Sequence, residues 1–499
     1  MTPVASHPQR TLRVAALGTL LVLAVFSAIV TTIDDSVRSL HAGIAGETWA
    51  LSGMSLGLAT TLLTAGALAD DIGHRRVLTW SAGLLSVASA MAALAPDAAL
   101  LVAARVLQGM AGAGVLAASL GSIGRAFPSG PERAHATGIW GAAVGAGITA
   151  GPLASALLAV PLGWRSGYWL EAAAAAAVML AATTLDDVDR RARGRLDLAG
   201  IATLGAGMAL LTAGMVEARH AWTGAAALAL FGTAALLLGG FAAIELRRRR
   251  PLVDPRLFGQ PGFLASVAGA LFTGLAIVGL MSYAPGVMQR VLHITVLESA
   301  LVLCAWSATS MVVALAARKL PAALGARARV AIGLALCATG EAALTGLGAD
   351  SEWIRLVPGL LVAGVGSGVA NAGLGRLAVE SVPPDRAGMG SGANNTARYL
   401  GGAAGVALVV TIVSGAGGDS LTRGWNTAAL VSAGLSALGA VIVASCRGRR
   451  RRPVPAPALH LAHQFVRPVV RAHPRPTAHA STEAWPIAPG SRALTRRTK

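Results

Sequence analysis

The chain has 499 residues, of which 54% are hydrophobic and 13% are charged, and its mean hydropathy is +0.63. This composition excludes a soluble domain and predicts a polytopic membrane protein, because a helix needs about 20 apolar residues to cross a bilayer. The formal charge of +18 is concentrated after Cys446, where twelve Lys and Arg accompany one acidic residue, so it gives no signal for nucleic-acid binding. The three cysteines have no paired spacing and predict neither a disulfide framework nor a metal site.

Fourteen apolar stretches long enough to span a membrane follow one another along the chain. They cover approximately residues 13–34, 46–69, 77–95, 98–124, 135–160, 164–185, 196–217, 222–246, 262–288, 296–317, 328–347, 353–376, 388–415 and 425–446. The first is expected to be an uncleaved helix, because it is longer than a signal-peptide core and lacks a small-residue cleavage pattern. Loops after the even-numbered stretches hold nineteen Lys and Arg, against six after the odd-numbered ones. The positive-inside rule therefore predicts that both termini are cytoplasmic, and twelve or thirteen spans would break this alternation.

Charged segments divide the chain into parts. The predicted parts are a cytoplasmic N-terminus (1–12), a six-helix bundle (13–185), a charged linker with two extra membrane helices (186–260), a second six-helix bundle (261–446) and a tail (447–499). The tail is rich in Pro, Arg, Ala and His and lacks a long apolar run, so we expect it to be disordered and cytoplasmic. Its run Arg447–Arg452 is expected either to bind anionic lipid or only to fix the orientation of the chain.

The segment 66–76, between the second and third apolar stretches, reads Gly-Ala-Leu-Ala-Asp-Asp-Ile-Gly-His-Arg-Arg. Its glycines suit close packing and a sharp reversal because they have no Cβ. Its aspartate lies where the chain leaves the membrane, and its arginines lie where the cytoplasm and lipid phosphates favour positive charge. The pattern resembles the loop between helices 2 and 3 of the major facilitator superfamily. The residues that we expect to act in gating are Gly66, Asp70, Gly73, Arg75 and Arg76.

The stretch 98–124 contains the pattern Arg105-x-x-Gln108-Gly109. An arginine inside a span is energetically expensive and usually faces a cavity or a partner, and Gln108 lies one turn later on the same helix face. Gly109 allows a neighbouring backbone to approach. The pattern resembles the Arg-x-x-Gln-Gly motif of the superfamily, which is implicated there in proton handling and in shaping the central cavity. The alternative is an arginine whose side chain extends to the outer surface.

A third motif lies in the stretch 135–160. Gly147, Gly151 and Pro152 resemble the antiporter motif Gly-x-x-x-Gly-Pro-x-x-Gly, with Ser155 in place of the last glycine. Small residues spaced by four share a helix face and permit tight packing, and a proline removes one backbone hydrogen bond. Alone this motif is moderate evidence, because glycine-rich helices pack in many membrane proteins, but it follows the first two motifs in the order that the family has.

Polar residues gather near the start of the stretch 388–415. Asn394, Asn395 and Arg398 predict a polar network, because such side chains need partners across the bundle when they lie inside a membrane. The stretch also resembles the fourteen-span branch of the superfamily. A purely structural network is as consistent with these residues as a contact with substrate.

Two six-span halves around an extra pair resemble the fourteen-span drug:proton antiporter family over about residues 13–446. The resemblance implies an all-α polytopic membrane protein with the major facilitator fold: two six-helix bundles plus two extra central helices, fourteen transmembrane helices in all. It implies export of small amphipathic compounds (drugs, antiseptics or antibiotics) across the plasma membrane by proton antiport with alternating access, without a cofactor. A facilitator-fold transporter without proton coupling is the alternative. A membrane-embedded enzyme or receptor is a remote alternative, because no catalytic constellation stands out.

The chain departs from the family pattern at the carboxylates. The family's first helix carries a deep aspartate where this chain has Val25, and the nearest acids are Asp34 and Asp35 at the outer end of the span. We expect one of these aspartates to pair with Arg105 in one conformation and to be released in the other, and so to couple protons. Glu171 stands where an asparagine is expected, and we expect a structural role for it, as for Glu341, because both helices are peripheral in this fold.

Asp70 is also expected to act as a latch. In a conformer that is closed on the cytoplasmic side, repeat correspondence places the segment 66–76 against the start of the stretch 388–415. The first turn of that helix has free backbone N–H groups and the positive end of the helix dipole, which together form an anion site.

Overall fold

The computed structural model describes most of the chain. The described ranges are residues 8–127, 131–186, 198–218, 223–248, 255–317, 324–348, 350–382, 387–415 and 421–446. Several predictions lie outside these ranges: those for the first seven residues, for the charged linker over 187–197 and for the tail from residue 447 onward, including Arg447–Arg452.

The described residues form helices and no strands, and the helices coincide with the fourteen predicted stretches. In chain order the first half consists of α1 (Pro8–Ser39), α2 (Ile44–Ile72), α3 (His74–Ala93), α4 (Ala98–Ala126), α5 (Pro131–Leu162) and α6 (Arg165–Thr183). Two helices follow, α7 (Leu198–Glu217) and α8 (Ala225–Arg247). The rest consists of η1 (Pro255–Gly259), α9 (Pro261–Phe272), η2 (Thr273–Val278), α10 (Gly279–Val291), α11 (Val296–Ala316), α12 (Ala326–Ala343), η4 (Trp353–Leu356), α13 (Val357–Glu380), α14 (Ala387–Gly415) and α15 (Leu421–Ser445).

Eleven helices among the described residues are long and apolar enough to cross a membrane, when α9, η2 and α10 are taken as one and η4 with α13 as one. The helices α6 and α12 fall below that measure, and α7 counts only over its apolar part Ala202–Leu211 among the described residues. In α12 the cause is visible in the sequence, because Arg327, Arg329 and Glu341 lie within its 18 residues. The structure therefore supports eleven to fourteen membrane helices in place of the predicted fourteen.

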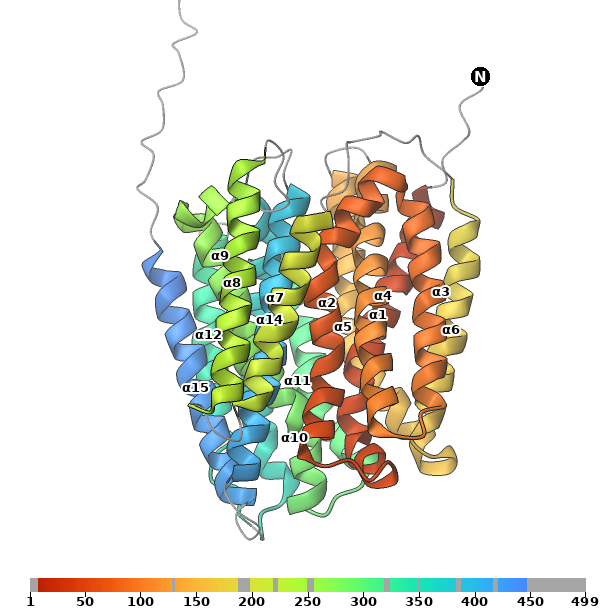
Figure 1. The fold of residues 1–499 in the computed structure, drawn as a ribbon. Coiled ribbons are helices and arrows are strands. Elements are labelled where there is room, and N and C mark those ends of the chain that lie inside the picture. The colour runs from red at the N-terminus through yellow and green to blue at the C-terminus, as the bar shows by residue number, and fades with distance from the viewer. Residues whose placement is uncertain are drawn as a thin grey trace, which may run out of the picture. The chain divides into compact units, whose positions relative to one another are not determined.

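The helices pack in two groups (Figure 1). In the first bundle, α1 packs on α4 and α5, α2 on α4, and α3 on α4 and α6. In the second bundle, α13 packs on α11 and α12, α15 on α12, and α14 on α9, η2, α10 and α15. The two bundles meet where α2 contacts α14, α5 contacts α11 and α1 contacts α10, and α7 contacts both α2 and α14 beside this seam. Lipid offers the backbone no hydrogen bonds, which explains why the apolar stretches satisfy their own as helices.

The segment 66–76 is more helical than we predicted. Helix α2 continues to Ile72 and α3 begins at His74, so the reversal is confined to Gly73, whose φ is +106°. A side chain at this backbone angle would be strained, which explains the glycine. The close packing that we expected at Gly66 is wrong, because a Cβ added there would meet no atom within 4 Å.

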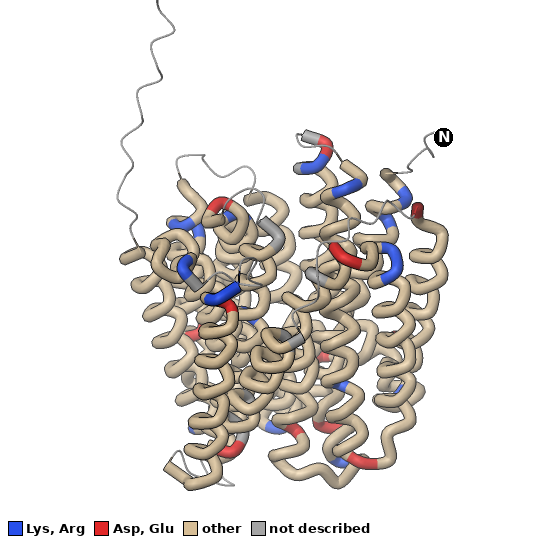
Figure 2. Tube along the Cα trace, turned by 45° about the horizontal axis from the view of Figure 1, so that its top comes forward, with Lys and Arg blue, Asp and Glu red and all other residues tan. Residues whose placement is uncertain are grey.

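The charges are distributed unevenly between the two ends of the helices (Figure 2). We call one end the Asp70 end, where α1 begins and α2 ends, and the other the Arg290 end, where α1 and α10 end and α2 begins. Most of the described arginines lie at or near helix termini of the Asp70 end. This is the asymmetry that the predicted cytoplasmic side requires.

Candidate functional site

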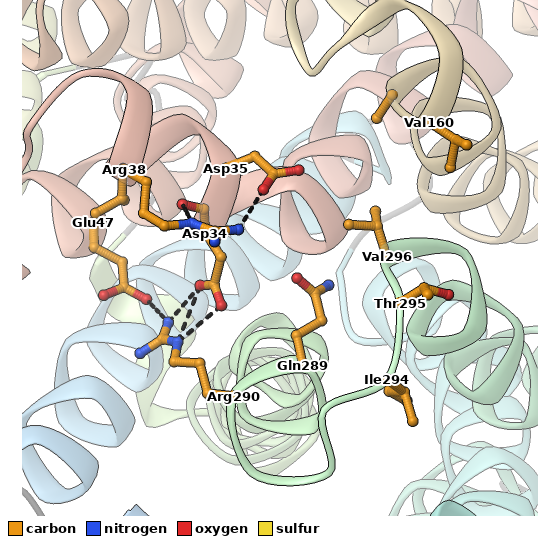
Figure 3. A pocket seen from close by; sticks show the side chains of 12 residues that line it. Asp34, Asp35, Arg38, Glu47, Val160, Gln289, Arg290, Ile294, Thr295 and Val296 are labelled. Carbon is orange, nitrogen blue, oxygen red and sulfur yellow. Dashed lines mark hydrogen bonds and ion pairs between the residues drawn. The ribbon is translucent and has the colours of Figure 1, made fainter.

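A cavity of about 720 Å³ lies at the Arg290 end, between the ends of α1, α5 and α10 and the beginnings of α2 and α11 (Figure 3). The guanidinium of Arg290 lies between two carboxylates of the first bundle. Its Nη2 is 2.7 Å from Asp34 Oδ1 and its Nε is 2.9 Å from Asp34 Oδ2, and Nη2 also donates to Glu47 Oε1. We call these three residues the Arg290 cluster. It joins α1 and α2 of the first bundle to α10 of the second.

The Arg290 cluster is shielded from water to different degrees. The side chains of Asp34 and Glu47 are 10% and 6% exposed, and that of Arg290 is 29% exposed. The guanidinium also donates through Nη1 to the Tyr283 hydroxyl at 3.0 Å and lies over the Tyr283 ring. Two carboxylates against one guanidinium leave a formal charge of −1. The cluster is therefore a place where addition of a proton or a cation balances the charge.

A second polar contact crosses the seam beside the cluster. Gln289 Nε2 donates to the Thr31 carbonyl oxygen of α1 at 2.8 Å and to Ser299 Oγ of α11 at 2.8 Å. The neighbouring Asp35 takes no part, because its carboxylate pairs with Arg38 of its own helix at 2.5 Å. Both predicted aspartates line the cavity, but only Asp34 forms an ion pair across the seam.

Arg105 is fully buried in the first bundle, so the alternative of a side chain that reaches the outer surface is wrong. Its Nη1 donates to the Val25 carbonyl at 3.0 Å and to Gln108 Oε1 at 2.9 Å. Its Nη2 donates to the Phe26 carbonyl and its Nε to the Ala50 carbonyl, both at 3.3 Å. The one arginine therefore holds the backbones of α1 and α2 against α4. The planar, five-donor guanidinium suits this task.

Gln108 extends this network away from Arg105. Its Nε2 donates to Ser89 Oγ of α3 at 2.9 Å and to Glu171 Oε2 of α6 at 3.1 Å. Gly109 acts in packing, since a Cβ there would lie 2.2 Å from the Met54 carbonyl oxygen of α2. The pattern Arg105-x-x-Gln108-Gly109 thus joins α4 to four other helices, α1, α2, α3 and α6.

The structure does not bring the predicted coupling residues together in this conformation. Asp34 is bound to Arg290, and Arg105 donates to backbone carbonyls and Gln108. Sequence reasoning missed Arg290 and Glu47. The sequence contained a weak indication of this site, because Arg290 follows Tyr283 by two helical turns and so lies on the same helix face. The carboxylate partners of Arg290 lie in the other bundle, and no pattern within one helix identifies them.

Asp70 lies at the end of α2 and is half exposed. Its Oδ1 is 3.4 Å from Arg125 Nη2 of α4 and 3.7 Å from His74 Nε2 of α3, so these contacts stay within the first bundle. Arg75 and Arg76 lie in the first turn of α3. We predicted that Asp70 contacts the start of α14 in a conformer that is closed on the cytoplasmic side, and this contact stays a prediction.

The glycines of α5 allow α1 to approach closely. A Cβ at Gly147 would lie 2.3 Å from the Leu20 carbonyl oxygen, and one at Gly151 would lie 2.2 Å from that of Ala24. The carbonyl oxygen of Pro152 accepts a hydrogen bond from Thr31 Oγ1 at 3.3 Å. The antiporter-like pattern therefore forms a contact surface within the first bundle, directly beside the helix that carries Asp34.

The polar residues of α14 have separate partners. Asn394 Nδ2 donates to Ser266 Oγ of α9 at 2.9 Å, whereas Asn395 Nδ2 donates to the Ser391 carbonyl of its own helix at 3.0 Å. Arg398 lies over the ring of Tyr399, 5.1 Å from its centre, and Tyr399 packs edge-on against Phe26 of α1. A partner across the bundle, as predicted, is described for Asn394.

Comparison with known proteins identifies the family. Residues 15–406 match the Major Facilitator Superfamily. The chain is 33% identical to the cephamycin export protein CmcT of Amycolatopsis lactamdurans, over 83% of this chain and 89% of that protein. It is 29% identical to the multidrug resistance protein Stp of Mycobacterium tuberculosis (strain CDC 1551 / Oshkosh), over 77% of this chain and 71% of that protein.

A solved structure shares the fold. The human organic anion transporter MFSD10 (TETRAN) superposes with a TM-score of 0.61 at 17% identity, over 88% of this chain and 99% of that one. The sequence match, the apolar helices and the relatives named for multidrug resistance and for cephamycin export agree. The chain is a multi-pass membrane transporter, not an enzyme, and it belongs to the Major Facilitator Superfamily.

Proposed function

We propose that this protein exports small amphipathic compounds across the plasma membrane by alternating access, driven by proton antiport. Support for export comes from the relatives, whose names specify multidrug resistance and cephamycin export. Support for a cytoplasmic Asp70 end comes from the arginines that gather there. The Arg290 end, with its cavity, then faces the outside, and both termini lie in the cytoplasm.

We infer that the Arg290 cluster is the gate that closes the Arg290 end during the transport cycle. This cluster is the main structural support for the proposed mechanism. For the central region to open at the Arg290 end, α10 must move away from α1 and α2, and Arg290 must leave Asp34 and Glu47. Removing one partner from a buried ion pair leaves an uncompensated charge, which costs about 3–5 kcal/mol. Opening therefore requires another charge to compensate the carboxylates, and a proton or a cationic group of the substrate can do this.

The proton-coupling role that we predicted for one of the two aspartates is proposed here for Asp34. Asp34 is buried at the bundle interface, whereas Asp35 is more exposed and pairs with Arg38 on the same helix. The pairing of Asp34 with Arg105 belongs to a second conformation, in which Arg290 has withdrawn. Arg105 and Gln108 hold α1 against α4 in the conformation described.

A facilitator without proton coupling is the second candidate. The observation that favours it is Val25, which stands where the resemblance leads us to expect an aspartate and whose carbonyl accepts a hydrogen bond from Arg105. Proton antiport then depends on a carboxylate elsewhere in the molecule. The two candidates differ in whether a pH gradient drives transport.

Inverted membrane vesicles separate the candidates. A cephamycin and ethidium, a fluorescent cation, are suitable probes within a wider panel of drugs and antiseptics. For an antiporter, we expect addition of a transported probe to discharge an imposed pH gradient, and uptake to stop when the gradient is collapsed. Uptake that continues unchanged after collapse refutes antiport and leaves the facilitator. No uptake of any compound in the panel refutes drug export.

A further inference from the structure

The network around Arg105 contains a carboxylate that the gate does not use. Glu171 of α6 is 7% exposed, and its Oε2 accepts a hydrogen bond from Gln108 Nε2 at 3.1 Å. Gln108 accepts in turn through Oε1 from Arg105 Nη1 at 2.9 Å. The amide of Gln108 thus connects a guanidinium to a carboxylate through hydrogen bonds that involve a charged group at each end.

Arg105 needs a compensating negative charge, because an unpaired charge is strongly disfavoured in a low-dielectric interior. Its other described acceptors are neutral backbone carbonyls, of Val25, Phe26 and Ala50. Asp34 is engaged with Arg290. Among the described residues, Glu171 is therefore the carboxylate that the hydrogen bonds connect to Arg105.

The surroundings of Glu171 contain further groups that can take part in proton transfer. Gln108 is its amide partner, and Arg105 of α4 is the charged group to which Gln108 connects it. Tyr168 lies one turn earlier on α6 and is buried, and its hydroxyl has no hydrogen-bond partner among the described residues. From α3, Ser89 Oγ accepts from the same Gln108 amide group as Glu171 does. Hydroxyl groups can both donate and accept protons.

We propose that Glu171 is a second proton site beside Asp34, and that it binds and releases a proton that drives transport. This inference rests on the proton antiport proposed above. The step is a proton transfer: the carboxylate takes a proton from water at one side of the membrane and returns it to water at the other. Because Arg105 binds the carbonyls of Val25, Phe26 and Ala50, the charge of Glu171 acts on α1 and α2, the helices that carry Asp34 and Glu47.

The substitution Glu171→Gln tests the proposal, because glutamine keeps the shape of the side chain and mimics the protonated acid. The matched control is Glu341→Gln, which changes another buried carboxylate, in α12, that takes no part in the hydrogen bonds around Arg105. We would reconstitute both variants and the parent, with a cephamycin and ethidium as probes. The measurements are discharge of a pH gradient, exchange of bound probe without a gradient, and the infrared band of a buried carboxylic acid as a function of pH.

We expect Glu171→Gln to lose at least tenfold in gradient-driven transport while it still exchanges probe, and to lack an infrared band that the parent and Glu341→Gln both show. Unchanged gradient-driven transport in Glu171→Gln overturns this inference and leaves the antiport intact. If the parent itself discharges no gradient, the antiport fails and the role of Glu171 fails with it. If Glu171→Gln loses exchange as well, the infrared band decides: its absence supports protonation of Glu171, and its persistence overturns the proposal.

Discussion

Asp34 offers the sharpest test of the gate. The substitution Asp34→Asn removes one negative charge from the Arg290 cluster and preserves the shape of the side chain. Asp35→Asn is the matched control, because it removes the neighbouring carboxylate, which pairs with Arg38 on its own helix and not across the seam. If the Arg290 cluster holds the Arg290 end closed, Asp34→Asn should open that end and Asp35→Asn should not.

The expected size of the effect follows from burial. Two unit charges 4 Å apart interact by about 4 kcal/mol at an effective dielectric constant of about 20, but by about 1 kcal/mol in water. Asp34 is 10% exposed and Arg290 is 29% exposed, so the pair lies between these limits. Arg290 keeps Glu47 as a partner in the variant. We therefore expect a loss of ~1–2 kcal/mol, which changes the ratio of closed to open molecules by roughly 5–30-fold.

A cysteine placed behind the gate can report this change. Ser52 is fully buried on α2, and its Oγ donates to the Ala403 carbonyl of α14 at 3.4 Å across the seam. We would introduce Ser52→Cys into a variant in which the three native cysteines are replaced, and label it from the Arg290 side with a membrane-impermeant maleimide. A cysteine at Val160, which is 68% exposed in the cavity wall, serves as the reference.

We expect Asp34→Asn to raise the labelling rate at position 52 by roughly 5–30-fold, in line with the free-energy change above, while the rate at position 160 stays constant. Equal rates at position 52 in the parent and in Asp34→Asn would refute the gate. An equal rise in Asp35→Asn would show that loss of charge at this surface, and not the ion pair across the seam, controls access.

Three further predictions follow from the helix contacts. Gly151→Ala should abolish transport and reduce the amount of folded protein in the membrane, because the added Cβ would lie 2.2 Å from the Ala24 carbonyl oxygen. The control Gly141→Ala, whose Cβ would meet nothing within 4 Å, should behave like the parent in transport and in gel filtration. Arg105→Lys should lower the melting temperature, because an ammonium group cannot reproduce the bonds to the carbonyls of Val25, Phe26 and Ala50, and an unchanged melting temperature would contradict this account. Asp70→Asn should shift molecules toward the conformer open at the Asp70 end by roughly 5–30-fold, for a loss of ~1–2 kcal/mol at the latch; equal cysteine labelling from that end in parent and variant would show that Asp70 is no latch.

The sequence by itself determined the class, the approximate helix positions and the family. Hydropathy and the alternation of basic loops are local properties, and a membrane allows few alternatives to a helix, so helices coincide with all fourteen predicted stretches. The glycines at 147 and 151 and the pair Arg105 and Gln108 were also found from the sequence, by their resemblance to family motifs and by the helical periodicity that fixes which residues share a face.

Only the tertiary structure decided which charges meet. Arg290 and Asp34 are 256 residues apart in the sequence. A hydropathy profile predicts which segments span the membrane, but it does not predict which side chains of two bundles come into contact. Glu171 was assigned a structural role because its helix is peripheral, yet Gln108 connects it to Arg105. Helix rotation and crossing decide whether a buried carboxylate faces a guanidinium or lipid, and these depend on packing among all neighbouring helices. The pattern within one helix shows that a polar side chain needs a partner, and the fold decides which partner it has.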